Sequence, residues 1–114
     1  MTTPFLVEQA IKEWSEAFSA TEANPRQMLS GEISVGEAAN RMSLYQAKED
    51  ALWFWKNSSE LPFELVRWFN TQNRSACDQC WISSSGSKHP ECQAKIDEYF
   101  SARKALAEYG TALV

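Results

Sequence analysis

Residues 77–92 read Cys77-Asp-Gln-Cys80-Trp-Ile-Ser-Ser-Ser-Gly-Ser-Lys-His89-Pro-Glu-Cys92. This stretch holds all three cysteines and the only histidine of the 114-residue chain. Cys77 and Cys80 are three positions apart, as are His89 and Cys92, so each pair fits on one side of a helical turn. Three thiols and one imidazole are the number and kind of ligands that a closed tetrahedral zinc site requires. We therefore expect a structural Zn²⁺ bound by these four side chains.

Three other interpretations of the same residues remain open. Cysteine packs readily as a small hydrophobic residue, so the three cysteines also suit a core position. A Cys-x2-Cys pair is also found at redox sites, although the strand–helix context of those sites is missing here. An iron–sulfur cluster mostly uses four cysteines. The ligand count and spacing favour structural zinc over all three.

On both sides of this stretch, apolar residues recur at the three- and four-residue spacings of amphipathic helices. Helix start and stop signals place four main helices at about 4–23, 34–57, 61–78 and 90–109, with a short turn at 25–30. We find no convincing pair of strands. The sequence therefore predicts an all-α fold. It would be a single domain, 1–114, built as a small helical bundle. Its zinc-binding segment, 77–92, would close a hairpin between the last two helices.

The helical periodicity also predicts which positions face the core. These are Val7, Ala10, Ile11, Trp14, Ala17 and Phe18 in the first helix; Val35, Ala38, Ala39, Met42, Tyr45, Leu52 and Trp53 in the second; Phe63, Leu65, Val66, Trp68, Phe69 and Gln72 in the third; and Cys92, Ile96, Tyr99, Phe100, Arg103, Leu106 and Ala107 in the fourth. Asn24 is expected to cap the short turn, and Gly110 to end the last helix.

Trp53, Phe54 and Trp55 are consecutive large aromatic residues at the end of the second helix. Neighbouring residues on a helix point about 100° apart, so the three rings cannot share one face. We favour a central position in the core, because buried aromatic residues are common in small domains. The alternative is a partner-binding surface, which would include Trp81 from the zinc segment.

The charge balance bears on the kind of partner. The net charge is −4, and residues 1–60 carry five basic and nine acidic side chains, whereas residues 61–114 carry six of each. An acidic chain is a poor match for the phosphate backbone of a nucleic acid. It suits a basic protein instead, for example a nucleic-acid-handling enzyme. We therefore expect a non-enzymatic protein-binding module, such as an inhibitor or regulator.

Two other functions remain alternatives. A zinc-dependent nucleic-acid-binding regulator would use the cations of the second half, namely Arg67, Arg74, Lys88, Lys95, Arg103 and Lys104. A small metal-dependent enzyme would need an open zinc position beside Asp78 or Glu91. The chain has no phosphate-binding loop or nucleophile motif, which disfavours catalysis.

The expected location is the cytoplasm, because the sequence shows no signal peptide and no apolar run long enough for a membrane span. Thiols stay reduced in the cytoplasm. The odd number of cysteines also argues against a framework of disulfide bonds. A homodimer formed through the aromatic helices is compatible with each of these functions.

Overall fold

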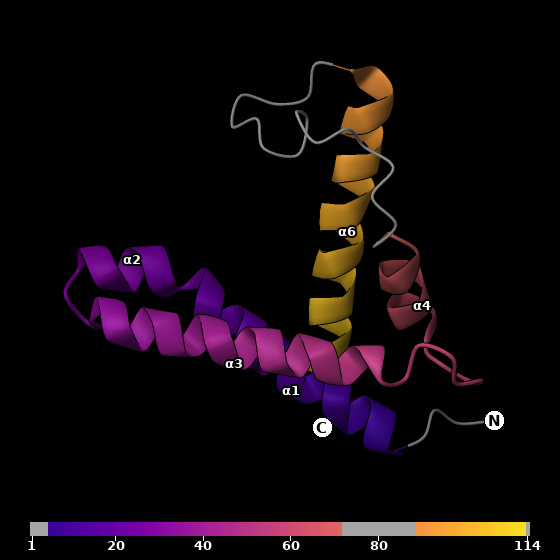
Figure 1. Cartoon of the computed structure of the whole chain (residues 1–114), viewed down its shortest axis with the longest axis horizontal. Helices are drawn as coiled ribbons and strands as arrows, with labels where there is room; N and C mark the ends of the chain where they lie inside the picture. The colour runs from indigo at the N-terminus through magenta and orange to yellow at the C-terminus, as the bar shows by residue number, and fades with distance from the viewer. Residues whose placement is uncertain (1–4, 72–88, 114) are drawn as a thin grey trace. The chain divides into compact units, whose positions relative to one another are not determined.

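The computed structural model describes residues 5–71 and 89–113, and within these two ranges the regular structure consists of helices with no strand. The helices are α1 (Phe5–Glu22), α2 (Asn24–Leu29), α3 (Val35–Trp53), α4 (Phe63–Asn70) and α6 (Pro90–Ala112), as Figure 1 shows. The predicted all-α class is therefore confirmed for this part of the chain. None of the described helices has the length and apolar character that crossing a membrane requires.

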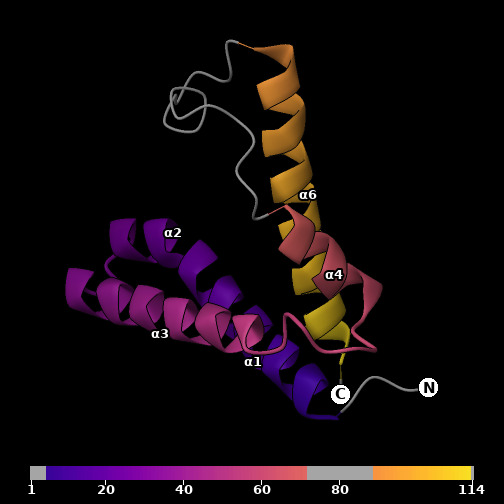
Figure 2. The ribbon, with the colours of Figure 1, turned by 45° about the vertical axis from the view of Figure 1, so that its right-hand side comes forward.

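The chain forms two compact units, one of residues 1–61 and 107–114 and the other of residues 62–106. The prediction of a single domain stays a prediction. In the first unit, α1 and α3 lie side by side in opposite directions, and α2 contacts both of them (Figures 1 and 2). The apolar stripe of α1 supplies much of the core, as predicted. The buried apolar residues of these helices and their connections are Val7, Ile11, Trp14, Ala17, Phe18, Ile33, Ala38 and Leu52.

Aromatic contacts join α1 to α3. The rings of Trp14 and Phe18 stack with centroids 5.3 Å apart, and the ring of Tyr45 lies 6.0 Å from Trp14 and 5.8 Å from Phe18. Such ring pairs stabilise a core beyond the area that they bury. Tyr45 is therefore fixed in place on α3 by two side chains of α1.

Asn24 does not have its predicted role as a cap. It is the first residue of α2, the capping position is Ala23, and no side chain makes the cap bond there. The buried Asn24 side chain instead donates a hydrogen bond from Nδ2 to the carbonyl oxygen of Ala38, at 3.2 Å. Arg41 Nη1 completes this network by donating to Asn24 Oδ1 at 3.3 Å and to the side chain of Gln27. Polar bonds thus tie α2 to α3.

The second long helix begins where the sequence predicts and ends earlier. The Glu37 amide donates to Ser34 Oγ at 3.1 Å, so Ser34 is the N-cap of α3. After Trp53 the chain continues in turns with i to i+3 hydrogen bonds, so the regular helix stops four residues before the predicted end. The core positions predicted for the first turns of α3 are wrong. Val35 is 77% exposed, and Ala39 and Met42 are also exposed.

The second unit is built from α4 and the first part of α6. Its buried apolar residues are Leu65, Trp68, Phe69, Cys92, Ile96, Ala102 and Leu106. Phe63, Val66 and Phe100 were expected in the core but are exposed. Arg67 of α4 forms an ion pair with Glu98 of α6, with 2.7 Å between Nε and Oε1. The helix predicted over 61–78 ends at Asn70, and its last part lies outside the described residues.

Gly110 is not a helix cap, because α6 continues to Ala112. It is a buried residue of the first unit inside the helix, and among the described glycines it is Gly31 that has a positive φ. A Cβ atom at Gly110 would lie 2.8 Å from the carbonyl oxygen of Ile11. Glycine is needed here because the end of α6 approaches the backbone of α1 too closely for a larger side chain.

Candidate functional site

His89 and Cys92 lie together at the start of α6. Cys92 is in the first turn and only 5% exposed, whereas His89 precedes the helix and is exposed. The carbonyl oxygen of His89 accepts the amide of Gln93 at 2.9 Å. Cys92 Sγ is 3.8 Å from His89 Nδ1. The structure therefore brings together two of the four predicted zinc ligands.

The spacing of this pair fits zinc. Zinc–sulfur and zinc–nitrogen bonds of about 2.3 and 2.0 Å at a tetrahedral angle place the two ligand atoms about 3.5 Å apart. The observed 3.8 Å is close to that separation.

The other half of the predicted zinc site lies outside the described residues. Cys77 and Cys80 belong to residues 72–88, as does Trp81 of the predicted partner surface. Among residues 5–71 and 89–113, no group of three or more metal-binding side chains occurs. The four-ligand site thus stays a prediction.

The aromatic segment at the end of α3 is not part of the core. Phe54 is 81% exposed, and Trp53 and Trp55 are half-buried, whereas their neighbour Leu52 is fully buried. The core position favoured from the sequence is therefore wrong for Phe54, whereas Trp53 and Trp55 are partly covered. The rings of Phe54 and Trp55 meet edge to face, with centroids 5.5 Å apart. Phe54 still has helical backbone dihedrals, so it lies about 200° around the helix from the buried Leu52 and its ring is exposed.

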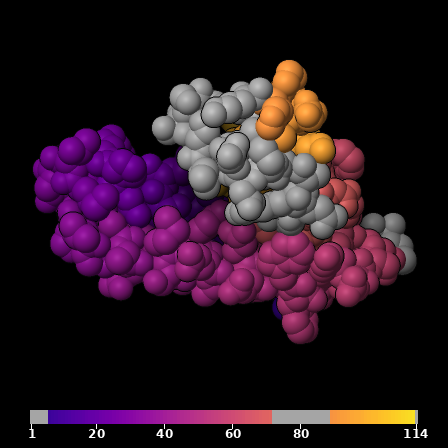
Figure 3. Space-filling model, turned by 45° about the horizontal axis from the view of Figure 1, so that its top comes forward, coloured from indigo at the N-terminus to yellow at the C-terminus, as the bar shows by residue number. Residues whose placement is uncertain are grey.

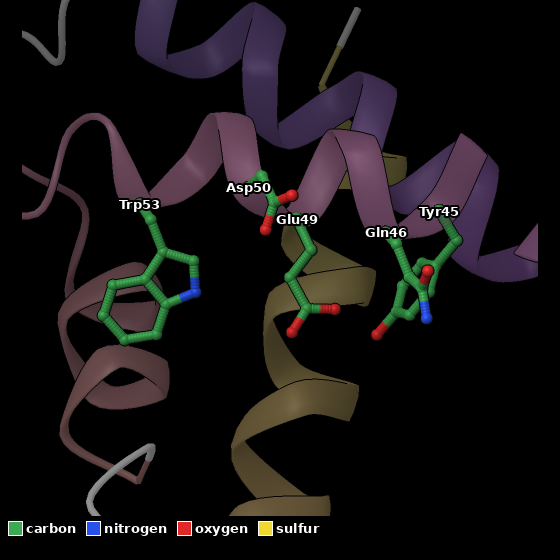
Figure 4. A pocket seen from close by; sticks show the side chains of 5 residues that line it. All are labelled: Tyr45, Gln46, Glu49, Asp50 and Trp53. Carbon is green, nitrogen blue, oxygen red and sulfur yellow. The ribbon is translucent and has the colours of Figure 1, made fainter. Parts of the chain in front are cut away.

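A hollow lies beside α3 that the sequence does not predict. It has a volume of about 430 Å³ and is lined by Tyr45, Gln46, Glu49, Asp50 and Trp53, as Figure 4 shows. These positions have the spacing of one helical face. The sequence shows this spacing but not the hollow, because its periodicity predicts core positions for both Tyr45 and Trp53. In the space-filling view, atoms of α3 (magenta) are visible along much of the helix (Figure 3).

The first unit is acidic. It carries ten Asp and Glu against five Lys and Arg, a net charge of −5, whereas the second unit has a net charge of +1. One acid is neutralised locally, because Lys48 Nζ lies 2.6 Å from Glu13 Oε1. The hydrogen bond from Lys48, helped by one from Gln9, lowers the pKa of Glu13. Within the described part of the chain, no ion pair involves Glu49 or Asp50.

Two of the cations considered for nucleic-acid binding are held by contacts inside the second unit. Arg67 donates to Glu98 and, from Nη2, to Ser101 Oγ at 3.0 Å. The ion pair raises the pKa of Arg67 and lowers that of Glu98. The guanidinium of Arg103 lies 5.0 Å from the ring centroid of Phe100 and 5.6 Å from that of Tyr99. These contacts explain why Arg103 lies on a face that is otherwise apolar.

The described chain thus offers three features with functional chemistry. They are the His89–Cys92 pair, the aromatic segment of residues 53–55, and the hollow on α3. Known proteins give no further guide to their roles, since no protein-family model, curated protein or solved structure matches this chain.

Proposed function

We propose that this protein is a non-enzymatic binding module that acts on a basic protein partner, as an inhibitor-type regulator does. The observation that carries the proposal is the exposure of Phe54, 81%, beside two half-buried tryptophans in an acidic unit. Aromatic side chains dominate the energetics of protein interfaces. Acidic surroundings speed the encounter with a basic partner and disfavour acidic ones.

The proposal includes a structural Zn²⁺ held by Cys77, Cys80, His89 and Cys92. The contact between His89 and Cys92 supports it, because the two side chains already have nearly the separation of zinc ligands. When bound, the metal would supply a crosslink and no reactive position, since four protein ligands complete its coordination. A reducing compartment, the cytoplasm, would keep the three thiols available.

The zinc site is tested by metal analysis of tag-free protein purified under reducing conditions. We expect one zinc per chain, and a Cys77→Ser variant that binds less zinc and melts at a lower temperature. His89→Gln is the cleaner companion variant, because His89 is exposed and contributes little to packing. Cys92 is buried, so its replacement would lower stability with or without a metal. Metal-free protein, or variants that melt like the wild type with zinc present, would overturn this part of the proposal.

The partner surface is tested with Phe54→Ser and a matched control, Phe63→Ser. Both phenylalanines are largely exposed, at 81% and 74%, but they belong to different units. We expect quantitative affinity capture from a cell extract to lose its specific basic partner with the Phe54 variant and to keep it with the Phe63 variant. If both variants capture the same proteins as the wild type, the aromatic segment is not the interface. Sedimentation over a range of concentrations separates a homodimer from a different partner.

A further inference from the structure

The hollow on α3 combines carboxylates with aromatic rings. The described residues that line it are two acids, two aromatic residues and one amide from the face of α3 that Figure 4 shows. We propose that this hollow binds an arginine side chain from a basic segment of the partner protein. This inference rests on the proposed function and adds the chemical identity of what the module recognises.

The acids of the hollow carry charge that the described part of the chain leaves uncompensated. Glu49 is half-buried and Asp50 is exposed, and neither forms an ion pair with a described residue. Glu13 of the same unit, in contrast, is paired with Lys48. Two adjacent carboxylates in a unit with a net charge of −5 attract a cation.

The aromatic walls are suited to a cation as well. The ammonium group of Lys56 lies 5.1 Å from the ring centroid of Trp53, so this ring already makes a cation–π contact. Tyr45 at the other end of the hollow is held by Trp14 and Phe18. A rigid aromatic wall loses little conformational entropy when a ligand binds.

Arginine matches these walls better than lysine does. A guanidinium is planar, stacks on aromatic rings and binds a carboxylate through two parallel hydrogen bonds. The ammonium of lysine is a strongly hydrated point charge, which loses more on entering a hollow. The volume of about 430 Å³ lies within the usual range of binding pockets, roughly 300–1,000 Å³.

The test uses fluorescein-labelled peptides of four Gly-Arg repeats, four Gly-Lys repeats and four Gly-citrulline repeats. Fluorescence anisotropy is measured on the full-length protein at low and physiological salt. Citrulline has nearly the shape of arginine without its charge, so it reports the apolar contribution. We expect the arginine peptide to bind most tightly, the lysine peptide to bind several-fold more weakly, and the citrulline peptide to show no measurable binding.

Charge-matched variants then locate the site. Glu49→Gln/Asp50→Asn should weaken binding of the arginine peptide about tenfold, from the loss of two charge pairs. The control, Glu16→Gln/Glu22→Gln, removes the same charge from exposed positions on α1 and should weaken it by less than about threefold. Equal effects of the two double variants would overturn the proposal, because binding would then depend only on net charge.

Lys56 offers a test with the opposite sign. Lys56→Gln removes the cation beside Trp53, so it should strengthen binding of the arginine peptide by about two- to fivefold. Lys12→Gln makes the same charge change on α1 and should have a smaller effect. An equal gain from both lysine variants contradicts a role of the Trp53 ring.

The proposed arginine site and the proposed partner-binding function can be disproved separately. A partner that is lost with Phe54→Ser but retained by Glu49→Gln/Asp50→Asn would leave the proposed function intact and overturn the arginine site. Peptide binding that depends on Glu49 and Asp50, with no basic partner captured by any variant, would support the hollow and overturn the proposed function.

Discussion

Gly110 lies against Ser15 so closely that a Cβ atom added to the glycine would be 1.8 Å from Ser15 Oγ and 2.8 Å from Ser15 Cβ. Both residues are buried in the first unit, Ser15 in α1 and Gly110 near the end of α6. The carbonyl oxygen of Ile11, also 2.8 Å from that position, belongs to the backbone and cannot move aside. The two helices can therefore approach this closely only because residue 110 is a glycine, which has no side chain.

Gly110→Ala should lower the free energy of unfolding by about 1–3 kcal/mol, the usual effect of overpacking a core. Urea unfolding followed by circular dichroism measures the change. The control is Gly36→Ala in α3, where a Cβ would be an ordinary 3.7 Å from Ser34 Oγ. That variant should gain up to about 1 kcal/mol, because alanine is the better helix former. A Gly110 variant as stable as the wild type would contradict the close contact.

The buried Asn24 should matter more than an ordinary surface amide. Asn24→Ala removes its hydrogen bond to Ala38 and leaves Arg41 with one acceptor fewer, so it should cost about 1–2 kcal/mol of stability. Asn40→Ala is the control, because Asn40 is exposed on the same helix that Asn24 contacts. Thermal melting of both variants checks the prediction. Equal melting temperatures would show that the Asn24 network contributes nothing.

The sequence predicted α1 well because the apolar stripe of this helix is covered along its length, with Val7, Ile11 and Trp14 fully buried. The same reasoning failed on α3, where Val35 and Met42 repeat with helical spacing but remain exposed. Periodicity shows which residues share a face, and it does not show whether another element covers that face. The core at Leu52 was predictable, and Phe54 is exposed because a residue two positions further along a helix lies on nearly the opposite side.

The candidate sites also differ in how far the sequence predicts them. The His89–Cys92 pair could be read from the sequence, since three-residue spacing at a helix start fixes the two side chains locally. The hollow could not be predicted from the sequence. One of its walls is Tyr45, whose ring is held by Trp14 and Phe18 from a distant part of the chain. Gly110 was misread because a glycine near a helix end serves equally as a cap or as a close contact.

Glu60 has a φ of 65°, in the left-handed region that glycine tolerates best. Glu60→Gly should therefore raise the free energy of unfolding, by up to about 1 kcal/mol after the entropy of the unfolded glycine is subtracted. Gly31 allows the opposite substitution. Its φ is also positive, at 78°, and an added Cβ would meet no atom within 4 Å. Gly31→Ala should lower stability by about 1 kcal/mol through backbone strain alone. Changes of the same sign in both variants would contradict this explanation.

The ion pair of Glu13 with Lys48 should make stability depend on pH in acid. The pKa of Glu13 is lowered in the folded state, chiefly by the hydrogen bond from Lys48 and then by that from Gln9. A carboxylate with a lowered pKa stabilises the fold above its unfolded pKa, about 4.3, and loses that contribution as the pH falls through the folded value.

Glu13→Gln should therefore destabilise the protein at pH 7 and have a smaller effect near pH 3. Both side chains are about one-third exposed, so the loss at pH 7 should stay below about 1 kcal/mol and shrink further in 1 M salt. Urea unfolding at the two pH values measures it, and Glu16→Gln, an exposed neighbour on α1, serves as the control. A Glu13 variant whose loss is the same at pH 3 as at pH 7 would mean that the side chain acts through packing. The charge of Glu13 would then play no part in holding α1 to α3.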